Sequence, residues 1–194
     1  MNTIVEKLSP GITKMIRMDH THVMTLFHRF AVDTPVSRKK AIVESVCLAL
    51  EIHAQLEEEI FYPALREVAS DNEALEKAPV EHAEMRRLIE KLRALETDSP
   101  ELDATFQELM RDVIHHVADE ETSLLPAAES LLKDRLAELG AQMTKRRFEL
   151  AGPRMGEIAG ATARTMPAAG AMLMAGGLLA GGYLLKRAFQ PHRH

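Results

Sequence analysis

The 194-residue sequence contains no tryptophan, one cysteine and only 4% aromatic residues. A lone cysteine excludes an internal disulfide framework and any metal site built from several thiolates. The scarcity of aromatic residues, and the lack of runs in which Val, Ile, Tyr and Thr alternate with polar residues, argue against β-strands. Abundant Leu, Ala, Glu, Lys, Arg and Met favour helices instead. The sequence therefore predicts an all-α protein.

Charge is unevenly distributed along the chain. Residues 1–139 contain 16 Lys and Arg against 27 Asp and Glu, a net charge of −11, whereas residues 140–194 contain 8 against 2, a net charge of +6. An acidic body does not suit nucleic-acid binding, so we expect no nucleic-acid partner. The first thirty residues include several charges and no long apolar run. We therefore expect no signal peptide and a cytoplasmic location.

Four long amphipathic patterns, separated by short breaks rich in Pro, Asp, Asn and Ser, predict four helices. The patterns begin near residues 10, 36, 72 and 100. Because the connections are short, helices that follow one another should be antiparallel. The expected fold is an up-down-up-down antiparallel four-helix bundle that occupies residues 1–140.

The composition changes after residue 140. Residues 141–165 are rich in basic residues and contain Gly-Pro, so we interpret them as a basic linker. Residues 166–194 form a hydrophobic Gly/Ala-rich tail, in which residues 168–185 carry no charge. A helix of this length would span about 27 Å, just short of the ~30 Å hydrocarbon core of a membrane.

The uncharged segment has two interpretations. Lys186 and Arg187 follow it directly, which favours a C-terminal anchor that attaches the cytoplasmic bundle to a membrane. Gly177 and Gly181 are four residues apart and would let two such helices pack closely, which suggests a homodimer formed through the tail. The alternative is a disordered or loosely packed segment.

The predicted bundle contains an internal repeat. HAQLEEEIFYP at residues 53–63 and HVADEETSLLP at residues 116–126 share a His, a Glu-Glu pair and a final Pro at the same spacing. Asp19-His20 matches Glu81-His82 about the same distance apart. The chain thus resembles two copies of one helix pair, with an acid-His on the first helix and His-x-x-x-Glu on the second.

This repeat predicts a buried metal site. A spacing of four places the His and the Glu of each pair on one helix face, and both pairs lie on the predicted inward stripes. Burying an ionised glutamate without a partner is very costly, and those stripes contain no Lys or Arg. A metal cation is the simplest partner. The predicted ligands are His20, His53, Glu57, His82, His116 and Glu120.

The donor types indicate the metal. Imidazole and carboxylate without thiolate suit iron, with manganese second, better than copper(I) or structural zinc. Four histidines and two glutamates suffice for two ions bridged by carboxylates and a solvent oxygen, with one coordination position open on each. A single inward histidine is more often a hydrogen-bonded core residue. Six such residues that all obey one repeat favour a dimetal site.

The same residues resemble a known family. DH at 19–20, HxxxEExxxYP at 53–63, EH at 81–82 and HHxxxEExxLLP at 115–126 are similar to the motifs of hemerythrin-like, HHE cation-binding proteins. The resemblance covers about residues 10–140. It implies a four-helix bundle around a non-haem diiron centre that binds oxygen or nitric oxide, senses iron or oxygen, or handles peroxide.

The chain departs from respiratory hemerythrins at two points. Those proteins have a further histidine four residues before the one matching His82, where this chain has Ala78. They also place the last carboxylate five residues after its histidine, which makes His115 an alternate to His116. The internal repeat and helix geometry favour His116. The missing histidine favours turnover, sensing or nitric oxide binding over reversible oxygen carriage.

Several other side chains are candidates for supporting roles. Glu58 and Glu121 follow the predicted ligands directly, and we expect them to hydrogen-bond the ligand imidazoles. The position left by the missing histidine has its own candidates, which are His22, His28, His115 and Tyr62.

The sequence supports three functional hypotheses. The first is a diiron protein that binds dioxygen or nitric oxide for sensing, scavenging or delivery. The second is a diiron enzyme that reduces peroxide or oxygen. The third is an interaction module whose stability responds to iron or oxygen.

Overall fold

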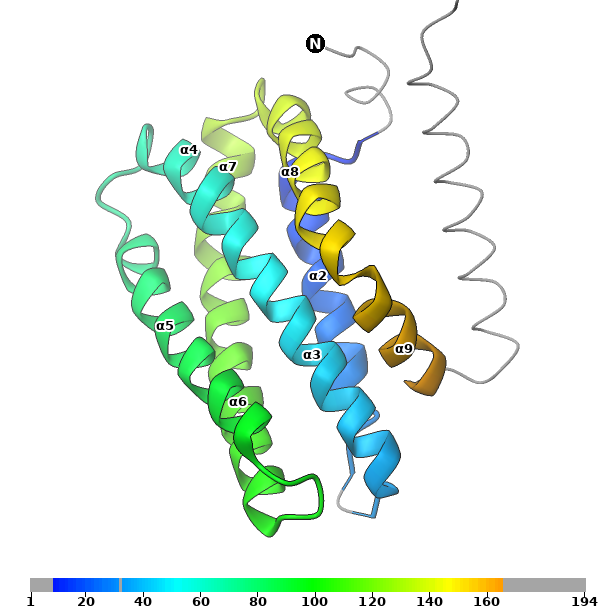
Figure 1. Cartoon of the computed structure of the whole chain (residues 1–194). Helices are drawn as coiled ribbons and strands as arrows, with labels where there is room; N and C mark the ends of the chain where they lie inside the picture. The colour runs from blue at the N-terminus through cyan, green and yellow to red at the C-terminus, as the bar shows by residue number, and fades with distance from the viewer. Residues whose placement is uncertain (1–8, 32, 166–194) are drawn as a thin grey trace, which may run out of the picture.

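The computed structural model describes residues 9–31 and 33–165, and these residues form helices joined by short loops (Figure 1). In chain order the elements are α2 (Ile12–Phe27), α3 (Val36–Leu56), η1 (Glu57–Phe61), α4 (Tyr62–Arg66), α5 (Glu73–Ala94), α6 (Pro100–Asp119), η2 (Glu120–Leu124), α7 (Leu125–Leu131), α8 (Leu136–Ala151), η3 (Gly152–Arg154) and α9 (Met155–Thr165).

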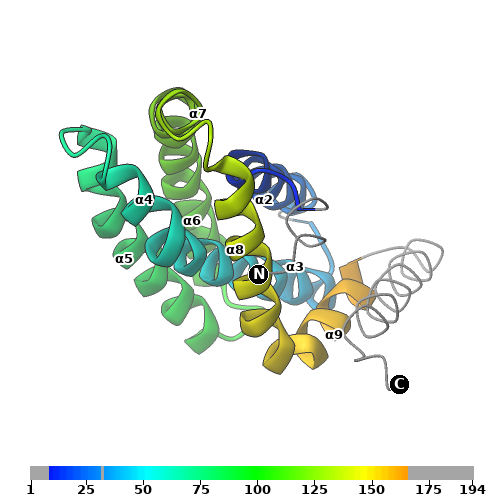
Figure 2. The ribbon, with the colours of Figure 1, turned by 90° about the horizontal axis from the view of Figure 1, so that it is seen from above.

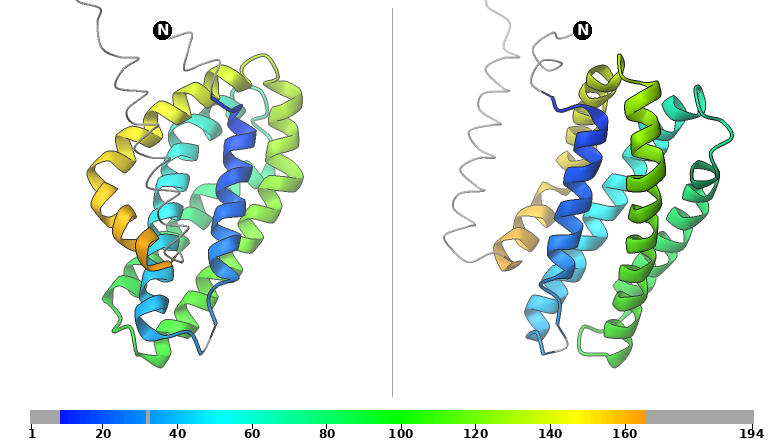
Figure 3. Two further views of the ribbon diagram at one scale, coloured as in Figure 1. Left: turned by 90° about the vertical axis from the view of Figure 1, so that its right-hand side faces the viewer. Right: turned by 180° about the vertical axis from the view of Figure 1, so that it is seen from behind.

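Elements α2 to α7 build the predicted bundle. The rods α2, α3–η1–α4, α5 and α6–η2–α7 run alternately down and up (Figures 1 and 3). The side chain of Asn72 accepts backbone N–H bonds at the start of α5, and Ser99 does so at the start of α6, where Pro100 is the first residue. Such caps satisfy backbone groups that a helix end leaves free. The predicted all-α, up-down-up-down bundle is confirmed.

Two of the rods contain a wider, π-helical turn. At η1 the backbone N–H of Tyr62 bonds to the carbonyl of Glu57, and at η2 that of Leu125 bonds to Glu120. In each case a proline, Pro63 or Pro126, follows directly, and proline cannot donate a bond to the preceding turn. π-helical turns of this kind are frequent at functional sites. Both begin at a glutamate of the predicted metal site.

The core is divided into two apolar clusters along the bundle axis. One lies around Leu56, Phe61, Tyr62 and Leu125, and it includes Ala78. The other lies around Val23, Phe27, Phe106 and Val113. The predicted metal ligands are all buried, yet they belong to neither cluster. A polar layer therefore separates two apolar halves.

The segment interpreted as a basic linker is helical. The predicted boundary at residue 140 falls inside α8, and α8, η3 and α9 pack along the α2–α3 side of the bundle, away from α5 (Figures 2 and 3). Gly140 lets α8 approach closely, because a Cβ there would lie 2.1 Å from the carbonyl oxygen of Pro10. Three arginines then pair with bundle carboxylates, in the pairs Arg146–Glu59, Arg147–Asp19 and Arg154–Glu51.

Among the described helices, none combines the length and the apolar character needed to cross a bilayer. The segment 168–185, for which the sequence suggests a membrane anchor and a homodimer contact, lies outside the described residues.

Candidate metal centre

Six buried side chains converge from all four rods of the bundle. His20 lies on α2, His53 on α3, His82 on α5 and His116 on α6, and each is at most 6% exposed. Glu57 and Glu120 open η1 and η2, and they are 0% and 1% exposed. These six are the residues predicted from the sequence.

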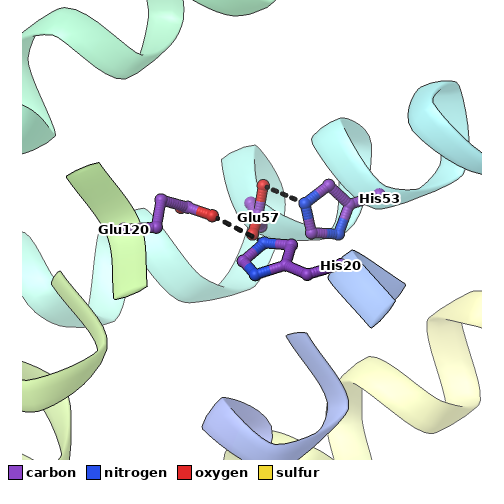
Figure 4. A group of neighbouring side chains, drawn as sticks. All are labelled: His20, His53, Glu57 and Glu120. Atoms are coloured by element: carbon purple, nitrogen blue, oxygen red, sulfur yellow. Dashed lines mark hydrogen bonds and ion pairs between the residues drawn. The ribbon is translucent and has the colours of Figure 1, made fainter. Parts of the chain in front are cut away.

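The donor atoms form two groups that share Glu57. His20, His53, Glu57 and Glu120 make one group, of which Figure 4 shows the side chains, and Glu57, His82 and His116 make the other. Within each group the donor atoms lie within 4.8 Å of one another. A shared carboxylate between two sets of histidines is the arrangement that two neighbouring cations need.

Each of the four buried histidines directs its Nε2 atom into the centre. His20 Nε2 lies 3.1 Å from Glu120 Oε2, and His53 Nε2 lies 3.2 Å from Glu57 Oε2. On the other side, His82 Nε2 lies 3.5 Å from Glu57 Oε2 and 3.1 Å from His116 Nε2. Four ring nitrogens and two carboxylates therefore face one another in a space that is closed to solvent.

Each of these four histidines also directs its Nδ1 atom outward, and each Nδ1 contacts a separate carboxylate outside the centre. The distances are 2.8 Å for His20 to Glu121, 3.4 Å for His53 to Asp19, 2.9 Å for His82 to Glu58 and 2.7 Å for His116 to Glu81. We call Asp19, Glu58, Glu81 and Glu121 the outer carboxylates. A carboxylate on one ring nitrogen fixes the tautomer and leaves the other nitrogen free to bind a metal.

The outer carboxylates follow the internal repeat. Asp19 and Glu81 each precede a histidine of the centre, and Glu58 and Glu121 each follow a glutamate of the centre. The sequence predicted the contacts of Glu58 and Glu121. It missed the contacts of Asp19 and Glu81, although the repeated acid-His pair was the signal that could have revealed them.

Arginines hold three of the outer carboxylates. Arg147 of α8 makes two hydrogen bonds to Asp19, Arg86 of α5 donates to Glu58 at 2.6 Å, and Arg17 of α2 donates to Glu121 at 3.0 Å. For Asp19, burial alone would raise the pKa, but hydrogen bonds from Arg147 and His53 hold it well below the usual range. Hydrogen bonds from His82 and Arg86 lower the pKa of Glu58 to about 2.

The electrostatics of the inner residues call for a positive partner. Burial and the neighbouring Glu120 carboxylate raise the pKa of Glu57 well above its usual range. Burial lowers the pKa of His53 and of His82, so their imidazoles favour the neutral form. His53 Nε2 and Glu57 Oε1 are buried without a hydrogen-bond partner among the described residues. Because unpaired buried polar atoms are costly, these atoms fit a bound cation.

The tyrosine of the first repeat lies against the centre. The Tyr62 hydroxyl donates to Glu120 Oε1 at 2.9 Å and lies 3.3 Å from Glu57 Oε2. It also lies 3.4 Å from His82 Nε2. Burial and the two carboxylates raise the pKa of Tyr62, so its phenol stays protonated. The second copy of the repeat has Leu125 at this position.

A model of the hemerythrin HHE cation binding domain matches residues 11–128, which is more than half of the chain. The chain belongs to the hemerythrin HHE family. A solved HHE cation binding domain-containing protein from Mycobacterium kansasii has a similar fold, with a TM-score of 0.64 and 19% identity; the match covers 80% of this chain and 99% of that chain.

A curated relative is much longer than this chain. A DNA nickase from Nostoc sp. is 29% identical over 133 residues, which make up 69% of this chain and 38% of the nickase. This HHE chain therefore spans well under half of that relative.

The other histidines considered for the site lie away from the centre. His115, the alternate to His116, is exposed, and so are His22 and His28. At the position of the missing histidine, Ala78 is buried in the apolar cluster around Leu56. Of the candidates for that gap, Tyr62 alone reaches the inner groups.

A small cavity borders the HHE centre on the side away from Tyr62. It offers about 10 Å³ for the centre of a water-sized molecule, and all four candidate histidines line it. The rest of its wall includes the apolar side chains of Val23, Leu50, Met85 and Val113. A cavity of this size holds about one water molecule.

Proposed function

We propose that this HHE-family protein holds two iron ions and binds dioxygen or nitric oxide, for sensing, scavenging or delivery. The observation that carries the proposal is the pair of buried His/Glu groups that share Glu57 and border an apolar cavity. The family match supports cation binding at this place.

One ion would be held by His20, His53, Glu57 and Glu120, and the other by His82, His116 and Glu57. The donors are imidazole and carboxylate, without thiolate, which suits iron and, less well, manganese. When bound, iron would supply redox-active positions at which a small ligand can coordinate.

The chain's own residues would prepare the site in three ways. The outer carboxylates hold the Nδ1 atoms, which keeps each Nε2 lone pair directed inward. Tyr62 donates a hydrogen bond to Glu120 and so fixes that carboxylate. The apolar wall and the small volume of the cavity favour a diatomic molecule over an anion or a larger substrate.

A second candidate is the reduction of peroxide or oxygen. These reactions consume protons, and the Tyr62 hydroxyl is a buried, protonated donor that lies 2.9 Å from Glu120 Oε1. A phenol at this place could pass a proton to the centre and recover it through the carboxylates.

One experiment separates the two candidates. The full chain is loaded anaerobically with Fe(II), its iron content is measured, and absorption spectra are recorded after dioxygen, nitric oxide or peroxide is added. Two irons per chain and a stable dioxygen or nitric oxide adduct support the first candidate. Rapid loss of peroxide that repeats when an external electron donor is added supports the second. A chain that binds no iron would contradict both.

We propose no nucleic-acid role for the bundle. The nickase of Nostoc is named for DNA, but residues 1–139 of this chain carry a net charge of −11, which disfavours a polyanionic partner. A nicking assay on supercoiled DNA, with the iron-loaded chain, tests this expectation.

Membrane attachment and a homodimer through residues 168–185 stay predictions, supported by the uncharged sequence and by the Lys186-Arg187 pair that follows it. Membrane fractionation of the full chain and of residues 1–165 tests the anchor. Equal recovery of both in the supernatant would contradict it.

A further inference from the structure

A chain of contacts links helix α8 to the centre. Arg147 makes two hydrogen bonds to Asp19, Nη1 to Oδ1 at 2.6 Å and Nη2 to Oδ2 at 2.5 Å. Asp19 Oδ2 in turn lies 3.4 Å from His53 Nδ1. The Nε2 atom of the same imidazole faces Glu57 and has no hydrogen-bond partner in the part of the chain that the structure describes. The orientation of His53 thus depends on a carboxylate that α8 holds in place.

The arginine of this chain of contacts comes from outside the matched domain. The family model ends at residue 128, whereas Arg147 lies near the C-terminal end of α8. The corresponding arginines for Glu58 and Glu121 are Arg86 and Arg17, which belong to the bundle itself. α8 therefore supplies to His53, through Asp19, a support that His82 and His20 receive from within the domain, through Glu58 and Glu121.

Asp19 also has more need of such support than its counterparts. Its contact with a histidine Nδ1, at 3.4 Å, is longer than the other three, which measure 2.7 to 2.9 Å. The Asp19 side chain is also less exposed than its counterparts, at 17% against 32%, so without Arg147 its charge would be left largely buried and unpaired by any arginine.

We propose that Arg147 is a positioning residue of the metal centre, and that docking of α8 and metal loading at the His20–His53 pair are coupled through Asp19. The proposal rests on the proposed function, because it requires that the centre binds metal. Such coupling is reciprocal: α8 docking raises metal affinity, and metal binding strengthens α8 docking by the same factor.

The chain contains a matched control for this proposal. Arg146 is the neighbour of Arg147, it also makes two hydrogen bonds to a bundle carboxylate, Glu59, and it is similarly exposed, at 34% against 32%. Glu59, however, contacts none of the candidate ligands among the interactions of the described residues. Loss of Arg146 therefore removes a comparable docking contact without touching the centre.

The first test is an anaerobic titration of the full chain with Fe(II), in competition with a chelating dye. In Arg147→Ala we expect one of the two iron equivalents to bind about tenfold more weakly, the lower end of the range for the loss of an outer partner of a ligand. The other equivalent should keep its affinity. Arg146→Ala should match the wild type, and Arg147→Lys, which restores the charge but not the two-pronged contact, should fall between.

The second test measures the reverse direction by hydrogen exchange. Fe(II) loading should slow exchange of the α8 amides in the wild type and in Arg146→Ala, but not in Arg147→Ala. The proposal is overturned if Arg147→Ala and Arg146→Ala weaken iron binding equally, since the effect would then be one of docking alone. The proposal is also overturned if neither variant changes the affinity for iron. If the wild type binds no Fe(II), the proposed function fails together with this inference.

Discussion

The two ring nitrogens of each candidate histidine face different partners. Nε2 points into the centre and Nδ1 contacts an outer carboxylate, in the four pairs described above. Because the same repeat supplies both the histidines and the carboxylates, one duplication would have produced both the ligands and their supports. At the scale of single residues, the first prediction therefore concerns which histidines bind the metal.

His116 and His115 are adjacent, yet only His116 is buried among the donors. His116→Ala should remove a ligand of the His82–His116 pair, so iron per chain should fall by about half. His115→Ala should leave the iron content unchanged, because its side chain lies at the surface. Metal analysis of the two purified variants measures both. An equal loss in both variants, or a loss in His115→Ala alone, would refute this assignment.

Glu57 predicts an unusual pH dependence for the metal-free protein. Its pKa is raised in the folded state by burial and by Glu120, whereas in the unfolded chain it is about 4.3. Between these two values the folded state binds more protons than the unfolded state, so stability falls as pH rises, by at most about 1.4 kcal/mol per pH unit for one proton. Glu57→Gln cannot titrate, so it lacks this pH-dependent contribution to the free energy of unfolding.

Unfolding of metal-free wild type and Glu57→Gln by urea between pH 5 and 8 measures the effect. The variant should gain in stability relative to the wild type as pH rises. The lowered pKa values of Asp19 and Glu58 act in the opposite direction, but they are common to both proteins and cancel in the difference. A difference that does not change with pH would be evidence against a raised pKa at Glu57.

At the scale of the elements, sequence periodicity predicted the four rods and their inward faces. The 3.6-residue spacing and the internal repeat are local signals, and they brought the six inner residues to one layer. The docking of α8 and α9 had no such signal. The pair Arg147–Asp19 joins residues 128 positions apart, and the glycines and basic residues after residue 139 resemble a linker when taken alone.

The prolines of the repeat are a partial signal of the π-helical turns. Pro63 and Pro126 lack a backbone N–H and so disturb the helix, but the turns start earlier, at Glu57 and Glu120 themselves. The extra residue in each turn changes the register of everything that follows it, including Tyr62. Side-chain packing around the centre decides where such a turn begins, and periodicity does not describe packing.

The approach of α8 to α2 predicts an unusual result at Gly140. Ala normally stabilises a helix relative to Gly by about 1 kcal/mol. At Gly140, however, the new Cβ would lie 2.1 Å from the backbone oxygen of Pro10 and 3.0 Å from the backbone nitrogen of Ile12. Helix α8 would therefore have to move. We expect Gly140→Ala to destabilise the protein by about 1–3 kcal/mol, as overpacking does.

Gly156 in α9 is the matched control, since no atom of residues 9–31 and 33–165, apart from its chain neighbours and the backbone of its own helix, lies within 4 Å of a Cβ built there. Gly156→Ala should be neutral or stabilising by up to about 1 kcal/mol. Thermal unfolding of both variants provides the comparison. If Gly140→Ala is as stable as Gly156→Ala, α8 does not pack as closely as described.

At the scale of the whole molecule, the polar layer interrupts the core. Apolar packing stabilises the two clusters on either side of it, but the layer between them buries two carboxylates and four imidazoles. These groups come from all four rods, so a cation bound among them would connect the rods at mid-height. Without a cation the same layer opposes folding, because buried charges and unpaired polar atoms are costly.

Metal removal should therefore lower the stability of the entire fold and not only empty a site. Ligand binding to the folded state alone contributes RT ln(1 + [L]/Kd), or about 4 kcal/mol at a free metal concentration 1,000 times Kd. Thermal unfolding of the full chain, recorded anaerobically with Fe(II) and again after chelation, should show a large fall in Tm. The Glu57→Gln and His116→Ala variants should show a smaller difference between the two conditions. If chelation leaves the wild-type Tm unchanged, the buried layer is satisfied without metal, and the polar residues would then serve as a self-contained hydrogen-bond network.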